Sequence, residues 1–533
     1  MHLNNLIFTK ILFYFCNSVF TMVFRYLIFI FILFIASALN AQQKSRIYVN
    51  RADLQLYDES FGKDIERLIG NVVLKHESTI FYCDSAHLNS KSRNFNAFGN
   101  VHIHVNDTVD VYGNRLLYTG ENRIANLYDS VKLVDKETVL TTQHLIFNRK
   151  TNIAFYDVGG KIVNEENTLT SQRGHYHANT KVLYFRKDVV LINPDSETYS
   201  DTLIYNTITK TAFFKGPTVI RGEESIIYCE DGWYDTENDY SELTQRPSIS
   251  NAEQTVTADS LFYNNNISYG LATGNVVIDD TIHSIIIRGR KGEIWDADGL
   301  SYITDSAVAI SYDSEDSLFI HGDTLWMHFD KERKAKKMMA YYDVRMYRKD
   351  LQAVCDSMIY TMNDSTIRFM NDPVLWSGKN QLTADSINVI ASGGNIDSLI
   401  MFNTAFIISR DTLESFNQIK GKNMIGYFMD NELHKINVDG NAQIVYWIRE
   451  EDGYLVGINF SESSTMDIKL KNNEISTINL KTSPNEKMYP REEVSKEQER
   501  LKDFLWREEL RPENKFDIFT PKKTEKPKTE SED

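Results

Sequence analysis

The polar residues most able to do chemistry recur along the chain instead of converging on one place. A small residue followed by Asp and Ser or Thr stands at five positions: Asp84-Ser85, Asp201-Thr202, Asp259-Ser260, Asp356-Ser357 and Asp385-Ser386. A catalytic constellation normally occurs once, in a pocket. We therefore interpret the repeated aspartates as structural residues that pin the start of a strand or face solvent.

Two pairs of histidines have a spacing that metal ligands can use. His102 and His104 lie two residues apart, as do His175 and His177, so each pair would project from one face of a strand. A metal site needs further carboxylate or thiolate ligands beside such a pair. Without that completing set we interpret both pairs as exposed strand histidines, and we predict no metal site and no cofactor.

No motif of a known catalytic class stands out. Gly289, Gly292 and Gly299 are not followed by the Lys-Ser/Thr of a phosphate-binding loop, and neither a Ser/His/Asp arrangement nor a His-Glu-x-x-His motif is apparent. A repeat-built carbohydrate enzyme would carry paired carboxylates in one unit only, and we find none. We predict no catalytic residues and expect that the protein is not an enzyme.

The composition favours a large β-rich protein. The 533 residues are 42% hydrophobic and include 28 Tyr and 29 Phe but only 9 Pro, a balance that is typical of strands. The net charge is −16, and an acidic surface repels phosphate backbones. We predict no binding of nucleic acid.

The N-terminus has the features of an export signal. Arg25 precedes an apolar run, Tyr26 to Ile35, and small residues follow, with plausible cleavage points after Ala38 and Ala41. We predict that residues 1–41 are a signal peptide, with Met22 as the preferred true start. The alternative is a genuine N-terminal membrane anchor. Under both interpretations we expect the bulk of the chain to be exported.

The cysteines do not form a disulfide framework. Cys83, Cys229 and Cys355 are odd in number and show no Cys-x-x-Cys pattern. Cys83 and Cys355 occupy the slot that holds Ala258 and Ala384 in other copies of the phrase described next. The slot requires a small apolar side chain, and a buried thiol satisfies it.

One phrase recurs about every 29 residues. Its clearest copies are "NAFGNVHI" at 96–103 and "GLATGNVVI" at 270–278, and weaker copies extend from about residue 50 to about residue 480. Small or apolar side chains stand at alternate positions, as in a strand with one face against a core. Asn, Asp, Gly and Lys cluster between the halves, as hairpin turns require. We predict consecutive long antiparallel strands, about two per unit, each bent across its middle.

The repeats end near the C-terminus, and a different sequence pattern follows. Pro490 opens a segment in which Val494, Leu501, Leu505 and Trp506 would share one face of a short amphipathic helix that caps the open end of the sheet stack. The predicted regions are a signal peptide at 1–41, clear repeats at 42–280, degenerate repeats at 281–484, and a charged helix with a disordered tail at 485–533.

The apolar doublets at the end of each copy could line a groove. The candidate residues are Val101, Ile103, Val131, Leu133, Val189, Leu191, Val276 and Ile278. If the two halves of the sheet splay, these residues form a trough for alkyl chains, each buried CH₂ contributing about 0.8 kcal/mol. If the halves close, the same residues are simply a core. A ligand-free β-repeat scaffold of the cell envelope and an outer-membrane β-barrel therefore remain alternatives.

The phrases "TADSLFYNNNISYGLATGNVVI" and "FYCDSAHLNSKSRNFNAFGNVHI" resemble the OstA-like (organic solvent tolerance) repeat family, which includes the periplasmic lipopolysaccharide-transport protein LptA and the N-terminal domain of the translocon LptD. The resemblance implies an all-β fold, an elongated, V-shaped antiparallel β-jelly-roll whose groove holds lipid A acyl chains. It also implies a periplasmic role in carrying lipopolysaccharide toward the outer membrane. The implied partners are lipopolysaccharide and the inner- and outer-membrane transport components, with end-to-end self-association and outer-membrane association as further possibilities.

Overall fold

The protein is described here from a computed structural model. The predicted signal peptide over 1–41 and the predicted tail beyond residue 520 lie outside the described residues. Within the described residues, no helix combines the length and the apolar character needed to cross a membrane. The described ranges are 46–57, 59–105, 109–164, 167–312, 317–392, 395–412, 414–429, 432–450, 452–471 and 474–520.

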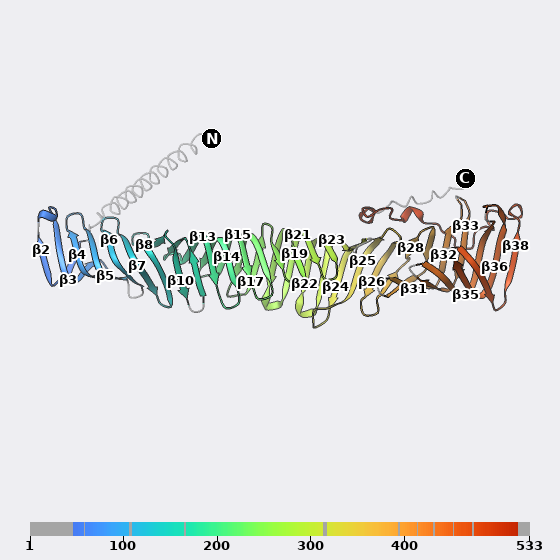
Figure 1. The fold of residues 1–533 in the computed structure, drawn as a ribbon, viewed down its shortest axis with the longest axis horizontal. Helices are drawn as coiled ribbons and strands as arrows, with labels where there is room; N and C mark the ends of the chain where they lie inside the picture. Colours follow the sequence, from blue (N-terminus) through green and yellow to red (C-terminus); the bar gives the residue numbers. More distant parts are fainter. Residues whose placement is uncertain are drawn as a thin grey trace, which may run out of the picture. The chain divides into compact units, whose positions relative to one another are not determined.

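The chain is all-β and antiparallel, as predicted, and folds as two compact units (Figure 1). Of the described residues, unit 1 comprises those from 46 to 164 together with 172–180, and unit 2 comprises 167–171 together with those from 181 to 520. The described helical elements are 3-10 helices of three residues: η1 (Glu59–Phe61), η2 (Asn265–Ile267), η3 (Asp296–Asp298), η4 (Arg491–Glu493), η5 (Glu508–Leu510) and η6 (Asp517–Phe519).

Unit 1 is a succession of long strands in which each pairs with the next. Strands β3 to β8 follow this order, β1 and β2 both pair with β3, and β9 and β10 both pair with β8. The strands are β1 (Ile47–Arg51), β2 (Leu54–Tyr57), β3 (Ile65–His76), β4 (Thr79–Asn89), β5 (Asn94–Val105), β6 (Val109–Thr119), β7 (Ile124–Asp135), β8 (Thr138–Asn148), β9 (Ile153–Tyr156), β10 (Gly160–Asn164) and β12 (Arg173–His177).

Unit 2 continues the same arrangement with long and with divided strands. The first strands are β11 (Asn167–Ser171), β13 (Val182–Ile192), β14 (Glu197–Asn206), β15 (Thr211–Arg221), β16 (Ile226–Asp235), β17 (Tyr240–Thr244), β18 (Ser248–Ser250), β19 (Gln254–Thr257), β20 (Ser260–Asn264), β21 (Tyr269–Asp280), β22 (Ile285–Trp295), β23 (Leu300–Ser311), β24 (Leu318–Phe329) and β25 (Ala335–Tyr347). The remaining strands are β26 (Gln352–Thr361), β27 (Thr366–Met370), β28 (Val374–Ser377), β29 (Asn380–Thr383), β30 (Ser386–Ser392), β31 (Asn395–Phe402), β32 (Ala405–Arg410), β33 (Phe416–Gly421), β34 (Asn423–Met429), β35 (Glu432–Arg449), β36 (Leu455–Lys471), β37 (Glu474–Lys481) and β38 (Asn485–Tyr489).

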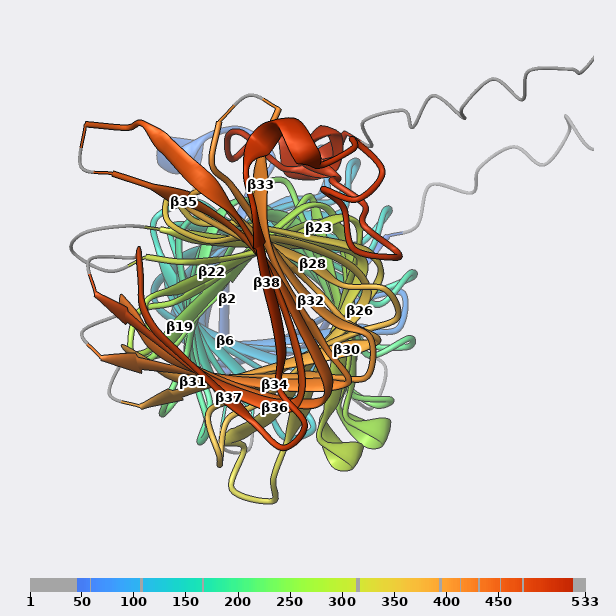
Figure 2. The ribbon, with the colours of Figure 1, turned by 90° about the vertical axis from the view of Figure 1, so that its right-hand side faces the viewer.

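The strand pairing of unit 2 separates two walls. Strand β26 pairs with β27 through one half and with β28 through the other. One branch then runs through β30, β31 and β34, the other through β29, β32 and β33, and both rejoin at β35. Figure 2 shows the two branches as separate walls, with β31, β34 and β37 along one and β28, β32 and β38 along the other. Each long strand therefore spans both walls and bends between them, as the repeat predicts.

A two-residue corner marks each bend. In β5 the register shifts between Phe98 and Val101, and the intervening Gly99 and Asn100 have φ of +73° and +42°. Glycine adopts this left-handed conformation freely, and Asn and Asp tolerate it better than other residues do. The Gly-Asn of the repeated phrase is thus a corner signal. We name the half of β5 before the corner, with the halves paired to it, the first wall, and the half after it the second wall; the same definition applies to β3, β7, β13, β15, β21 and β35.

The aspartate of the repeated motif holds this corner in place. Asn100 donates a hydrogen bond from Nδ2 to Asp84 Oδ2 (2.9 Å). At the corner of β21 the backbone N–H of Asp259 also donates to the carbonyl of Gly274 (2.8 Å) and to that of Thr273, the residue before the corner (3.1 Å). Equivalent side-chain bonds join Asn71 to Asp53, Asn275 to Asp259, Asn371 to Asp356 and Thr404 to Asp385. Four of the five repeated aspartates, those at 84, 259, 356 and 385, therefore have the structural role that the sequence predicts.

The predicted amphipathic C-terminal helix does not form. Residues 491–520, which we call the C-terminal strap, contain η4, η5 and η6 joined by irregular chain. Val494 packs against Val445 and Trp447 of β35, whereas Trp506 packs on Phe416 of β33, with ring centroids 5.2 Å apart. A helix rises only about 1.5 Å per residue. An extended chain is needed to bring these apolar side chains to separate strands, so tertiary packing overrides the helical pattern.

Two buried glutamines fasten the strap. Gln418 on β33 donates to the Glu499 carbonyl (2.7 Å) and accepts from the Leu501 N–H (2.8 Å). Gln381 on β29 bonds the carbonyl of Leu505 (2.8 Å) and the N–H of Arg507 (2.6 Å) in the same way. Each side-chain amide therefore pairs with the strap as a neighbouring peptide group would. The two sites lie six residues apart on the strap.

The strap makes the second wall of this region a buried layer. Phe406, Ile408 and Phe416 pack against strap residues Leu501, Phe504 and Trp506 (in red in Figure 1). The alternate residues of β32, Ala405 and Ile407, are also buried, so this strand is covered on both faces. The strap thus covers the outer face of the second wall in the C-terminal part of unit 2, instead of capping the end of the stack.

The corner predicts a steric cost at Gly99 that a matched glycine lacks. A Cβ at Gly99 would overlap the Asp84 carboxylate, whereas a Cβ at Gly159, which also has positive φ, meets nothing within 4 Å. We expect Gly159→Ala to lower the free energy of unfolding of unit 1 by about 1 kcal/mol and Gly99→Ala to lower it by about 1–3 kcal/mol more. Urea unfolding measures both. Equal costs would contradict the crowded corner, and Asp84→Ala should relieve part of the Gly99→Ala cost.

The glutamine contacts predict that the strap can be released locally. Each buried amide would leave unsatisfied backbone partners if removed, at about 1–3 kcal/mol. We expect the Gln381→Ala/Gln418→Ala double variant to speed tryptic cleavage after Arg500, Lys502 and Arg507 about tenfold or more, because the strap opens more often. Mass spectrometry follows the fragments. The control is Gln443→Ala, since Gln443 lies opposite Lys420 but makes no hydrogen bond to the strap among the described residues; an equal acceleration there would contradict the assignment.

Candidate functional site

The inner faces of the two walls begin with a row of small side chains next to the corner. In unit 1, Val72 lies opposite Cys83, and Val101 lies opposite Gly113. In unit 2 the corresponding pairs are Val189 with Ser200, Thr218 with Cys229, Val276 with Gly289, and Val344 with Cys355. The two walls converge at the corner, so only small side chains fit between them. This row is the physical basis of the small-residue slot that the cysteines indicate.

The predicted groove residues all lie on the second wall, on its inner side, at the first two inward positions after the corner. At the first position, Val101, Val131, Val189 and Val276 are no more than 2% exposed. At the second position, Ile103 is 1% exposed and Leu133 is 9% exposed, whereas Leu191 and Ile278 are half-buried. Unit 1 brings its four candidates into one hydrophobic cluster. From β13 to β22 of unit 2 the inner face becomes accessible away from the corner, whereas Ile320, Met346 and Leu375 at corresponding positions further along are buried.

Three further side chains of unit 2, Ile220, Ile227 and Ile287, extend this accessible inner face beside the predicted Ile278. Ile220 lies opposite Ile227, and Ile278 lies opposite Ile287, and all four are half-buried. Each stands at the second inward position of the second wall. The signal that could have identified them is their alternation with the small residues of the row, but neither Ile227 nor Ile287 stands in a copy of the "GNVVI" phrase. The result is a ladder of branched aliphatic side chains with near-equivalent surroundings.

In unit 1, by contrast, aromatic side chains join the two walls. Phe81 of the second wall contacts Phe95 and Tyr118 of the first wall, with ring centroids 5.1 Å and 4.9 Å away. Such ring contacts add to the energy of area burial. The three rings are no more than 1% exposed. At these rungs the inner face is a core and not an open surface.

Polar contacts also join the two walls near the outer ends of the same strands. His76 of the second wall lies with Nδ1 2.6 Å from the Tyr118 hydroxyl of the first wall, and both residues are buried. Burial raises the pKa of Tyr118 to about 12, so its hydroxyl stays protonated. Beyond them, Arg123 in a turn of the first wall donates to Glu77 in a turn of the second (2.6 Å). The walls are thus fastened together in this part of unit 1.

The histidine pairs have different surroundings. His102 and His104 on β5 share one face, as predicted, and Asp110 of β6 is hydrogen-bonded to both. Asp110 was not predicted as their partner, because it reaches the histidines only through the antiparallel pairing of β5 and β6. His175 and His177 on β12 lie opposite Phe155 and Ile153 of β9. They belong to no cluster of three potential ligands in the part of the chain that the structure covers.

The comparisons with known proteins identify the N-terminal part of the chain. Residues 44–201, less than a third of the chain, match the family model described as OstA-like protein. A search of curated proteins found no match. The matched range contains the six groove candidates from Val101 to Leu191, and it contains the corner signals of β5, β7 and β13. This stretch is OstA-like, as its resemblance in sequence implies.

The reactivity of the cysteines in the small-residue row tests whether water reaches this row. Burial raises the pKa of the Cys83 and Cys355 thiols to about 12 and that of Cys229 to about 11, and all three are free. A raised pKa keeps the thiol protonated, so at about pH 8 only about one Cys83 thiol in 10⁴ is the reactive thiolate. We expect iodoacetamide to leave all three unmodified in the native protein and to label them in concentrated guanidinium chloride.

The readout is mass spectrometry of peptides from a Cys16→Ser chain. This substitution leaves Cys83, Cys229 and Cys355 as the three thiols that iodoacetamide could label. Rapid labelling of Cys229 in the native protein would show that water reaches the corner row. The outer residues of the same strand provide the contrast: Ile226 is 51% exposed, so an Ile226→Cys thiol should react readily.

Proposed function

We propose that the protein is a periplasmic, non-enzymatic carrier of lipopolysaccharide that holds lipid A acyl chains between the two walls of unit 2. The observation that carries this proposal is the aliphatic ladder on the inner face, which is fully buried beside the corner and half-buried toward the rims. The OstA-like match over residues 44–201 supports the assignment to lipopolysaccharide transport. A role near the outer membrane follows from the same assignment.

The energetics of such a site suit transport. An acyl chain lying along Leu191, Ile220 and Ile278 would contribute about 0.8 kcal/mol for each CH₂ that leaves water. Successive rungs offer similar side chains at similar depth, so no single rung would trap the ligand. The chain could therefore be held firmly and still move along the ladder.

The rims of unit 2 also carry exposed apolar side chains. Ile192, Ile226 and Ile282 lie at or beside turns of the second wall and are 44%, 51% and 63% exposed. Ile192 and Ile226 are each one residue from the inward Leu191 and Ile227, so they point to the outer face beside the ladder and do not continue it.

The partners that we propose follow from the same function. Lipopolysaccharide is the ligand, and inner- and outer-membrane transport components would dock at the ends of the strand stack. Among the described residues, β37 and β38 pair only with β36, so each leaves one edge available for a further strand. End-to-end self-association through such edges is part of the proposal.

A second function, a ligand-free envelope scaffold, is favoured by one observation. The rungs of unit 1 between His76 and Tyr118 are closed by aromatic packing and by the Arg123–Glu77 contact, and they offer no surface to a lipid. The two functions differ in what they require of unit 2. A scaffold needs no occupant on the ladder, whereas a carrier does.

Photocrosslinking distinguishes the carrier from the scaffold. We expect a benzoylphenylalanine residue at Ile278 or Leu191 to form lipopolysaccharide adducts in cells that make this glycolipid. The matched controls are Val277 and Val190, which are the adjacent residues on the same strands and point to the opposite face. Adducts detected by anti-lipopolysaccharide blotting at the inner positions alone support the carrier. Folded protein without inner adducts, or equal adducts at both faces, would contradict it and favour the scaffold.

A further inference from the structure

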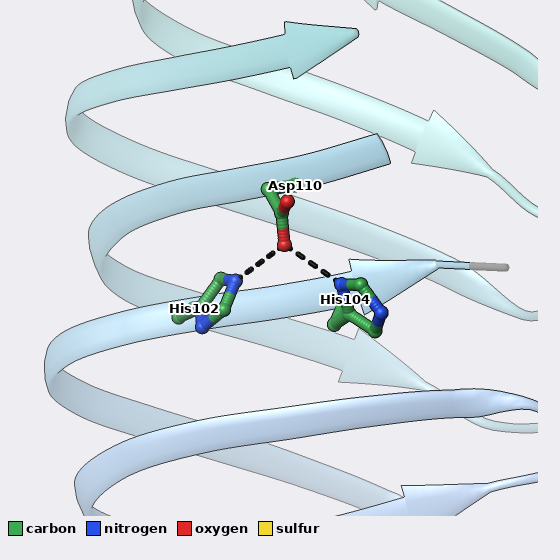
Figure 3. Close-up of side chains that lie close together, drawn as sticks. All are labelled: His102, His104 and Asp110. Atoms are coloured by element: carbon green, nitrogen blue, oxygen red, sulfur yellow. Dashed lines mark hydrogen bonds and ion pairs between the residues drawn. The ribbon is translucent and has the colours of Figure 1, made fainter. Parts of the chain in front are cut away.

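Two histidines and one aspartate converge on the outer face of the second wall in unit 1. His102 and His104 lie on β5, and Asp110 lies on β6 directly opposite His104 in the antiparallel register. Asp110 Oδ1 is 2.7 Å from His102 Nε2 and 2.8 Å from His104 Nδ1 (Figure 3). The three potential ligand atoms all lie within 4.8 Å of one another. One carboxylate oxygen of Asp110 thus accepts a hydrogen bond from each imidazole.

We propose that His102, His104 and Asp110 form a binding site for a divalent transition-metal ion of the Zn²⁺ type. Imidazole nitrogen and carboxylate oxygen are ligands that Zn²⁺ prefers, and three protein ligands with a solvent-filled fourth position form a known type of zinc coordination. In the metal-free protein the carboxylate accepts a hydrogen bond from each imidazole. The ion would bind the two ring nitrogens that now donate to Asp110. A neutral imidazole would then carry its proton on its other ring nitrogen, and an imidazole protonated on both nitrogens would release one proton to solvent.

Two tyrosine rings orient His102, the first of the three proposed ligands. The His102 ring lies between Tyr82 of β4 and Tyr112 of β6, with centroids 5.3 Å and 4.5 Å away and interplanar angles of 17° and 8°. Stacking on both sides restricts rotation of the imidazole and leaves its Nε2 directed at Asp110. Because all of these residues stand on paired strands, the donor set is held by rigid elements, as a metal site requires.

The site is also accessible to an ion from solution. The side chains of His102, His104 and Asp110 are 29%, 33% and 33% exposed. Water can therefore deliver the ion and complete its coordination. Asp110 already has a pKa below its usual range because both imidazoles bond it, so the carboxylate is ionised at neutral pH.

The ion would have a structural consequence that does not depend on lipid binding. Its ligands stand on two strands, so it would join β5 to β6 on the outer face, away from the buried Ile103. A ligand that binds only the folded state raises the stability of that state. We therefore expect Zn²⁺ to raise the unfolding temperature of unit 1.

Titration of the full chain, stripped of metal with EDTA, tests the site. We expect competition with a chromophoric chelator to show one Zn²⁺ site, and His104→Gln or Asp110→Ala to weaken its affinity more than tenfold, since even outer-shell changes at metal sites cost about 10–100-fold. His104→Gln retains a side chain that can still hydrogen-bond Asp110, so its fold should persist. Circular dichroism without metal checks that it does.

The second histidine pair provides the matched control. His175→Ala/His177→Ala removes two histidines with the same spacing on β12 and should leave Zn²⁺ affinity unchanged. The Zn²⁺-dependent rise in unfolding temperature should persist in this control and disappear in His104→Gln. No Zn²⁺ binding by the wild type, or equal affinity in the wild type and both site variants, would overturn the proposal. An affinity lost only in the His175/His177 variant would overturn it as well.

Discussion

The structure depends on one backbone constraint, a bend completed within two residues of left-handed conformation. Gly99-Asn100 and Gly274-Asn275 achieve it with residues that tolerate positive φ. Asp84 on the neighbouring strand, or Asp259 just before the neighbouring strand β20, accepts a hydrogen bond from the asparagine of the bend. Because the bend recurs at the same level in successive strands, the pleated chain becomes two walls instead of one flat sheet. The walls converge at the bend, which restricts the first inner row to Val, Thr, Ser, Cys, Ala and Gly. The residues of the repeated phrase therefore serve mainly to bend the strand.

Beyond that first row the two units use the inner face differently. In unit 1 the rings of Phe81, Phe95 and Tyr118 fill the distance between the walls, and the same rungs carry the His76 and Arg123 contacts across the rims. In unit 2 from β13 to β22, branched aliphatic residues stand at the corresponding depth and are only half-buried. An aromatic side chain closes a rung by reaching the opposite wall, whereas an isoleucine leaves part of its surface for another molecule. The difference between a core and a binding surface thus depends on side-chain reach, not on strand geometry.

Much of the fold could be predicted from the sequence because its determinants are local. The period of about 29 residues, the alternation around Val101 and Ile103, and the Gly-Asn pairs each report on a few neighbouring residues, and they indicate the strands, the inner face and the bends. The closure of unit 1 could not be predicted, because alternation shows which side chains point inward but not how far the walls stand apart. Asp110 was missed for a related reason: it joins His102 and His104 through strand register. The C-terminal helix was wrong because the spacing of Val494, Leu501 and Trp506 matches helical periodicity, yet their contacts lie on different strands.

The strap accounts for the way the later repeats depart from the phrase. From β26 onward the corner persists, as at Asn371-Asp372 and Asn403-Thr404, and Gly-Asn recurs at Gly440-Asn441. On the outer face, solvent-facing residues give way to Gln381, Gln418 and Phe416, which bond or pack against the strap. A strand buried on both faces loses the alternation of apolar and polar residues by which a half-buried strand is recognised. The degeneracy of the later copies is therefore the expected consequence of a second layer on the wall, and the bend itself remains the feature that every copy must preserve.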